Sequence, residues 1–112
     1  VKLLKIIYVN ELKFKDKREK LLSLERINFR GGELKSIPSE FKLLKKLETL
    51  CLDCNNFTEV PIEIQSLTNL NFLTLAMNNI SKLPSFLYDL KNLDVAYFGE
   101  SDQRFRSYPI TC

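Results

Sequence analysis

Residues 70–90 read LNFLTLAMNNISKLPSFLYDL, and the spacing of their apolar side chains decides the fold. Leu73 and Leu75 are separated by one residue, which is the period-two pattern of a short strand. Asn78 follows, and Pro84 then opens a segment whose apolar residues are three apart, the spacing of a helical turn. Proline suits this place because its φ is fixed and its missing N–H is not needed there. The stretch predicts one strand, one turn and one short helical return segment.

The same pattern recurs along the chain at a step of 23 residues. A repeat of fixed length such as this one sets the architecture of the whole fold. The coinciding positions are Leu24, Leu47, Leu70 and Leu93; Ile27, Leu50, Leu73 and Ala96; Phe29, Leu52, Leu75 and Phe98; Leu34, Phe57 and Ile80; Ile37, Val60 and Leu83; Pro38, Pro61 and Pro84; Phe41, Ile64 and Leu87; and Leu44, Leu67 and Leu90. This agreement defines three full units, at residues 24–46, 47–69 and 70–92, and predicts their short helical return segments at residues 39–44, 62–67 and 85–90.

The repeated unit resembles the leucine-rich repeat family, in its 23-residue form with a Leu-Pro step. The resemblance is strong over residues 24–92 and weak in the flanks, where residues 1–23 and 93–112 form degenerate first and last units. It implies one domain over residues 1–112 with an α/β solenoid fold. This leucine-rich repeat horseshoe would carry a parallel β-sheet on its concave face and short helical or 3-10 segments on its convex face.

By the family's pattern, the asparagine after each strand forms a ladder of hydrogen bonds to neighbouring backbone. Asn55 and Asn78 occupy this place in the second and third full units. The first full unit has Gly32 there and the last unit has Ser101. We therefore expect the ladder to weaken at both ends.

Cys51 and Cys54 form a C-x-x-C, a spacing also found in redox pairs and zinc sites. On a strand their Cα atoms would lie roughly 10 Å apart at about 3.3 Å per residue, whereas a disulfide needs about 7 Å or less. The chain has no histidine, and Asp53 with the distant Cys112 is a poor further set of zinc ligands. We expect neither a redox pair nor a metal site, and no cofactor.

Composition argues against an enzyme contained within this chain. The absence of histidine removes His-dependent acid–base chemistry, and no glycine-rich phosphate loop is present. Three cysteines are an odd number for a disulfide framework, so we expect a reducing, cytoplasmic location. No apolar run is long enough to span a membrane, and we expect a monomer.

Side chains alternate along a strand, so the residues between core positions are expected to point out of the concave face. The candidate partner-binding residues are Arg26, Asn28, Arg30, Thr49, Cys51, Asp53, Phe72, Thr74, Met77, Val95 and Tyr97. The apolar members gather on the later strands, and exposed aromatic side chains with a polar rim are typical of interface centres. We expect a non-catalytic interaction module, or scaffold, that binds a protein partner of unknown identity through this face.

Other functions are compatible with the repeat. It also fits the substrate- or ligand-recognition part of a larger enzyme or immune-type sensor whose catalytic or signalling domain lies outside this chain. An extracellular receptor fragment is disfavoured, because no cysteine-rich caps flank the repeats. The lysine-rich residues 13–20, with further lysines in 42–46, are compatible with a nucleic-acid or lipid surface. Interleaved carboxylates such as Asp16 and Glu40 favour a solvated face instead, so we expect no nucleic-acid partner.

Overall fold

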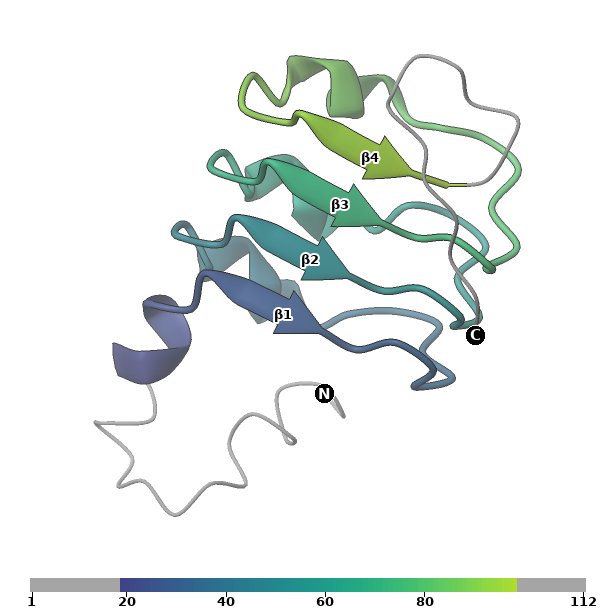
Figure 1. Ribbon diagram of the computed structural model, residues 1–112, viewed down its shortest axis with the longest axis horizontal. Coiled ribbons are helices and arrows are strands. Elements are labelled where there is room, and N and C mark those ends of the chain that lie inside the picture. The colour runs from purple at the N-terminus through teal and green to yellow at the C-terminus, as the bar shows by residue number, and fades with distance from the viewer. Residues whose placement is uncertain (1–18, 99–112) are drawn as a thin grey trace.

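The computed structural model describes residues 19–98, so most of the predicted first and last units lies outside the described residues. Residues 19–22 are helical. Strands and 3-10 helices (η) then alternate along the chain (Figure 1). They are β1 (Arg26–Asn28), η1 (Ser39–Leu43), β2 (Thr49–Cys51), η2 (Ile62–Ser66), β3 (Phe72–Thr74), η3 (Ser85–Asp89) and β4 (Val95–Tyr97).

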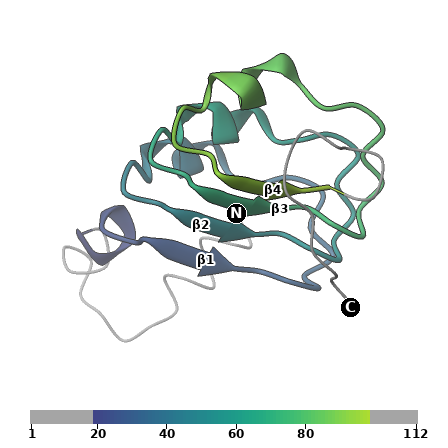
Figure 2. The same ribbon diagram turned by 45° about the horizontal axis from the view of Figure 1, so that its top comes forward.

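The four strands form one parallel sheet in the order β1-β2-β3-β4. The register advances by one repeat at each step, since Arg26 pairs with Thr49, Thr49 with Phe72 and Phe72 with Val95. Parallel neighbours need a crossover connection, and the 3-10 helices of these crossovers lie on one side of the sheet (Figures 1 and 2). The predicted parallel sheet with short helical segments between its strands is confirmed.

The middle residue of each strand points into the layer between the sheet and the 3-10 helices. Leu50 and Leu73 are fully buried there, and Ile27 and Ala96 are nearly so. The other repeated apolar positions complete the core, with Leu34, Ile37, Phe41, Leu44, Leu47, Leu52, Phe57, Val60, Ile64, Leu67, Leu70, Leu75, Leu87 and Leu90. Removing these side chains from water is the main favourable contribution to folding. The 23-residue pattern is therefore a pattern of burial.

Each 3-10 helix begins directly after the proline of the Leu-Pro step. These prolines occupy the N-cap positions, and their carbonyls accept hydrogen bonds from the N–H groups three residues on at 3.0, 3.1 and 3.3 Å. The predicted return segments at residues 39–44, 62–67 and 85–90 are confirmed. Each helix is one residue shorter than expected, because the last leucine forms the C-cap.

Asn55 and Asn78 join neighbouring repeats through their side-chain amides. The Asn55 Oδ1 accepts hydrogen bonds from the N–H groups of Gly32 and Leu34, at 2.8 and 3.0 Å. Its Nδ2 donates to the carbonyls of Phe29, Leu52 and Asp53. Asn78 bonds in the same way to Phe57, Leu52, Leu75 and Ala76. The predicted ladder is confirmed for both asparagines.

A second asparagine ladder, absent from the predictions, lies where each return segment leads into the next strand. The Nδ2 of Asn69 donates to the carbonyl of Lys45 at 2.8 Å, and that of Asn92 donates to the carbonyl of Thr68 at 2.9 Å. The two asparagines occupy one repeat position, so the sequence does carry the signal. Lys46 occupies the same position in the first full unit and interrupts the pattern.

The turns after β1, β2 and β3 each place the residue at one shared repeat position in the left-handed region. The φ angle is 74° at Gly31, 60° at Cys54 and 57° at Met77, three residues at the same repeat position. Left-handed backbone costs an L-residue roughly 1–2 kcal/mol, because Cβ approaches the following carbonyl oxygen. Glycine escapes this strain. In the second and third full units the surrounding fold therefore enforces the turn against local preference.

We expect Gly31→Ala to lower the free energy of unfolding by about 1 kcal/mol. A Cβ added at Gly31 meets no atom within 4 Å, so backbone strain alone would cause the loss. Urea unfolding followed by circular dichroism measures the change. Asparagine tolerates left-handed backbone, so Gly31→Asn should lose clearly less. Equal losses for the two variants would contradict strain as the cause.

Candidate interaction surfaces

The sheet face opposite the 3-10 helices, called the open face below, corresponds to the predicted concave face. The register brings the predicted residues of all four strands together on it. Four of the eleven predicted residues are exposed, namely Arg26, Asn28, Arg30 and Met77. Five are half-buried, namely Thr49, Cys51, Phe72, Val95 and Tyr97.

The other two predicted surface residues, Thr74 and Asp53, are buried, at 1% and 2% exposure. In the register Thr74 lies between Cys51 and Tyr97, whose strands flank it on both sides. Asp53 lies just beyond β2, where its Oδ1 accepts a hydrogen bond from the Ala76 N–H at 2.8 Å. These two side chains are therefore covered by their neighbours and present almost no surface to a partner.

The two cysteines of the C-x-x-C are not joined to each other, since Cys51 carries a free thiol and Cys54 is disulfide-bonded. The Cys51 thiol donates a hydrogen bond to the Asp53 Oδ2 at 3.3 Å. Burial raises the pKa of this thiol, because desolvation disfavours the thiolate. Reactive cysteines have lowered pKa values, so this geometry does not make Cys51 a nucleophile. The disulfide at Cys54 departs from the reduced cysteines that we expect in a cytoplasmic protein. The cytoplasmic location of the protein stays a prediction.

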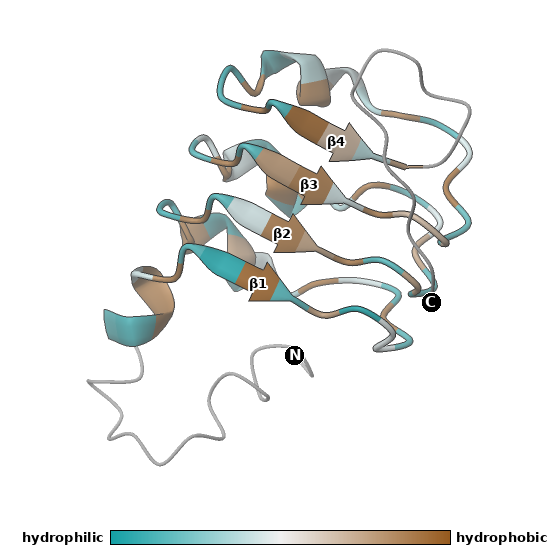
Figure 3. Cartoon of the chain, in the orientation of Figure 1, coloured by the Kyte–Doolittle hydropathy of each residue, from teal (hydrophilic) through white to brown (hydrophobic). Residues whose placement is uncertain are grey.

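At the starts of the strands, the sheet changes from hydrophilic at β1 to hydrophobic at β4 (Figure 3). Strand β1 is hydrophilic where it begins, at the exposed Arg26, whereas β4 begins with the apolar Val95. Phe72 and Val95 are register partners, and Tyr97 lies two residues beyond Val95 on the same face. Neighbouring strands lie about 4.8 Å apart, so these three residues form one apolar patch on β3 and β4.

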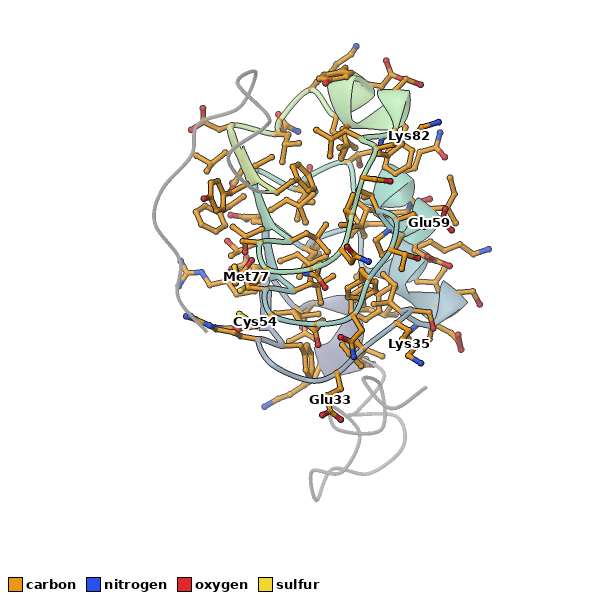
Figure 4. All side chains as sticks on the ribbon, turned by 90° about the vertical axis from the view of Figure 1, so that its right-hand side faces the viewer. Glu33, Lys35, Cys54, Glu59, Met77 and Lys82 are labelled. Carbon is orange, nitrogen blue, oxygen red and sulfur yellow. The ribbon has the colours of Figure 1, made fainter. Side chains whose placement is uncertain are left out.

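A groove that the sequence did not predict lies along the side where the turns lead into the 3-10 helices. This side groove has a volume of about 580 Å³, and three successive repeats line it, within residues 35–37, 57–63 and 82–86. Lys35, Glu59 and Lys82 lie one above another along this side of the molecule (Figure 4). Ser36, Glu59 and Lys82 share one repeat position. This position holds a serine, a glutamate and a lysine in the three repeats, so the repeated hydrophobic pattern does not predict a binding surface there.

Within residues 19–98, no three His, Cys, Asp or Glu side chains form a group that could hold a metal ion. The same residues contain no helix that is both long and apolar enough to cross a membrane. No family model matches the chain, and no curated protein matches it either. In the part of the chain that the structure describes, the open face and the side groove both carry features of a binding site.

Proposed function

We propose that the chain is a leucine-rich repeat solenoid that acts as a non-catalytic interaction module and binds a protein partner through its open face. The 23-residue pattern with its Leu-Pro step supports the family. The register supports the same proposal, because stacked repeats require each strand to pair with the strand one repeat away.

The single observation that carries the proposal is the apolar patch of Phe72, Val95 and Tyr97 beside the exposed arginines of the β1 region. The three patch side chains are only half-buried, so they retain apolar surface that a partner can cover. Aromatic residues and arginine are the side chains most enriched among residues that dominate binding energy. Fully burying a large apolar side chain contributes roughly 1.5–3 kcal/mol.

The backbone beneath this patch is held in place before any partner arrives. Leu73, between Phe72 and Thr74, is fully buried, and Ala96, between Val95 and Tyr97, is 2% exposed. Asp53 and Asn78 tie the strand ends of neighbouring repeats together. Association is weakened by every group that must be ordered on binding, so a preformed sheet surface is an efficient binding platform.

The double variant Phe72→Glu/Tyr97→Glu is expected to lose the partner. Two carboxylates in the apolar patch would remain hydrated and resist burial, and we expect at least about a tenfold drop in retained partner. Affinity capture from a lysate of the source organism, with quantitative mass spectrometry, measures the ratio of wild type to variant.

The matched control is Leu43→Glu/Gln65→Glu, which adds the same charge at two exposed residues of η1 and η2. Both variants must give the circular dichroism spectrum of the wild type. A protein captured by wild type and control but lost by the patch variant supports the proposal and identifies the partner. If the patch variant retains every protein that the wild type captures, the open face is not the binding surface.

A further inference from the structure

We propose that a disulfide between Cys54 and Cys112 ties residues 99–112 across the open face, where they cover the apolar patch until the bond is reduced. The cover acts on the surface that the proposed function uses, so its regulatory meaning rests on that function. The disulfide and the cover themselves need no partner, and they are measured without one.

The chain itself supplies the disulfide partner of Cys54. It has three cysteines, of which Cys51 carries a free thiol and Cys54 is disulfide-bonded. The structure consists of one chain, so the bond joins Cys54 to another cysteine of that chain. Cys112 is the cysteine that remains. The bond therefore brings the last residue of the chain to the turn after β2.

Cys54 lies just beyond the end of β2, towards the open face. In Figure 4, Cys54 and Met77 lie one above the other, on the side of the molecule away from the 3-10 helices. The two residues share one repeat position, and the Met77 side chain is 61% exposed. A segment that returns from β4 to Cys54 must therefore pass the end of β3 on the side of the open face.

The bond is incompatible with a C-terminal segment that continues the repeat. Residues 105–112, FRSYPITC, resemble residues 80–87, ISKLPSFL, with Cys112 at the position of Leu87. Leu87 is buried in η3, on the side of the sheet opposite the open face. Cys54 would also lie two repeats away, roughly 10 Å along the stack, whereas a disulfide needs Cα atoms within about 7 Å. The segment therefore turns back towards β2.

Residues 99–112 are long enough to cover the patch on this return. Their fourteen residues reach at most about 46 Å when fully extended. The strand β2 lies two strand spacings, or roughly 10 Å, from β4. With both ends fixed at one edge of the sheet, the segment has enough excess length to form a loop over β3 and β4.

The composition of the segment indicates which surface the loop covers. Phe105, Tyr108 and Ile110 lie within its last eight residues, close to the tether. Burying such side chains is favourable, and the half-buried apolar patch on β3 and β4 is the apolar surface along the return path. The disulfide holds the segment at a high effective concentration, so even a weak contact covers the patch.

Reduction uncovers the patch by thiol–disulfide exchange. A thiolate of a dithiol reductant attacks one sulfur of the Cys54–Cys112 bond and forms a mixed disulfide, and the second thiol of the reductant then closes a cyclic disulfide. Two electrons and two protons pass from the dithiol to the protein, which leaves Cys54 and Cys112 as thiols. The segment is then held only through β4, so its effective concentration at the patch falls.

Peptide mapping without reduction tests the bond. The full chain is oxidised with glutathione disulfide, which accepts the two electrons and two protons; free thiols are then blocked and the chain is cleaved after acidic residues. Asp53 lies between Cys51 and Cys54, so these two cysteines fall into different peptides. We expect peptide 54–59 joined to peptide 103–112 in a protein of 13.1 kDa. A bond between Cys54 residues of two copies, a bond to Cys51, or an unlinked Cys54 overturns the proposal.

The alkylation rate of Cys51 tests the cover, because Cys51 lies on β2 three residues before the tether. The oxidised wild type and the variant Cys54→Ser/Cys112→Ser each keep Cys51 as their one free thiol. A bulky maleimide should modify Cys51 at least about fivefold faster in the variant, since a covered site reacts only when it opens. Rates in urea normalise for intrinsic reactivity. Equal native rates overturn the cover even if the disulfide forms.

A second pair of variants separates the cover from a general loosening of the fold. Phe105→Ser/Ile110→Ser keeps the disulfide but removes apolar contacts, and should speed the alkylation of Cys51 at least about threefold. The matched control Gln103→Ser/Thr111→Ser changes two polar residues of the same segment and should leave the rate unchanged. All variants must give the circular dichroism spectrum of the wild type.

If the apolar variant and its control both react at the rate of the oxidised wild type, residues 99–112 do not cover the open face and the proposal is overturned. Partner capture is scored separately from these rates. The alkylation rates can change as expected while no partner is found, which would contradict only the proposed function. A partner can equally be captured through the patch while the rates stay equal, which would contradict only the cover.

Discussion

Asn55→Ala is expected to lower the free energy of unfolding by about 3–5 kcal/mol. The side chain is 6% exposed and makes five hydrogen bonds to the backbone. Truncation leaves the N–H groups of Gly32 and Leu34 without this acceptor, and three carbonyls without this donor. A buried polar group without a partner costs roughly 1–3 kcal/mol. The expected loss of stability is smaller than the sum of these penalties, because water enters part of the space that the Asn55 side chain leaves.

Urea denaturation measures this loss, with the slope of the transition checked for each variant. Asn56→Ala is the matched control, since Asn56 is the exposed neighbour and should change stability by less than about 0.5 kcal/mol. Asn55→Asp keeps the acceptor oxygens but buries a carboxylate against three carbonyl oxygens, so at neutral pH its loss should be at least as large as that of Asn55→Ala. If Asn55→Ala and Asn56→Ala behave alike, the ladder is not a main contribution to stability.

The sequence predicts the parts of the fold that depend on repeated burial. The strands, their register and the 3-10 segments follow because each apolar position, such as Leu50 and Leu73, recurs one repeat later in the same environment. Asn55 and Asn78 were also predictable, because a polar residue repeated inside an apolar pattern must be satisfied by neighbouring backbone. A position that recurs in every repeat therefore predicts both its own burial and the residues that it contacts in the neighbouring repeats.

The surfaces were less predictable, because their geometry depends on lateral neighbours that differ between repeats. Alternation alone places Thr74 and Asp53 on the open face, yet flanking strands and a bond to the Ala76 N–H bury them. The side groove was missed for a related reason. Its Glu59 and Lys82 share one repeat position but carry opposite charges, and a consensus averages over that difference.

Leu73→Ala is expected to lower the free energy of unfolding by about 3–5 kcal/mol. Leu73 is the middle residue of β3 and is fully buried. Its register partners are Leu50 on one side and Ala96 on the other. The cost of such a truncation grows with the cavity that remains. Because Ala96 is too small to fill the space and β2 and β4 hold the strand on both sides, we expect the cavity to persist.

The control is Leu43→Ala, which removes the same atoms from a side chain that is 48% exposed, on η1. It should cost less than about 1 kcal/mol, because little cavity is created and little apolar surface is lost from the core. Urea unfolding of both variants under one set of conditions gives the difference directly. Similar losses for the two would mean that the layer between sheet and 3-10 helices collapses around the missing side chain. The apolar patch would then not rest on a rigid sheet, and the preformed platform proposed for partner binding would lose its physical basis.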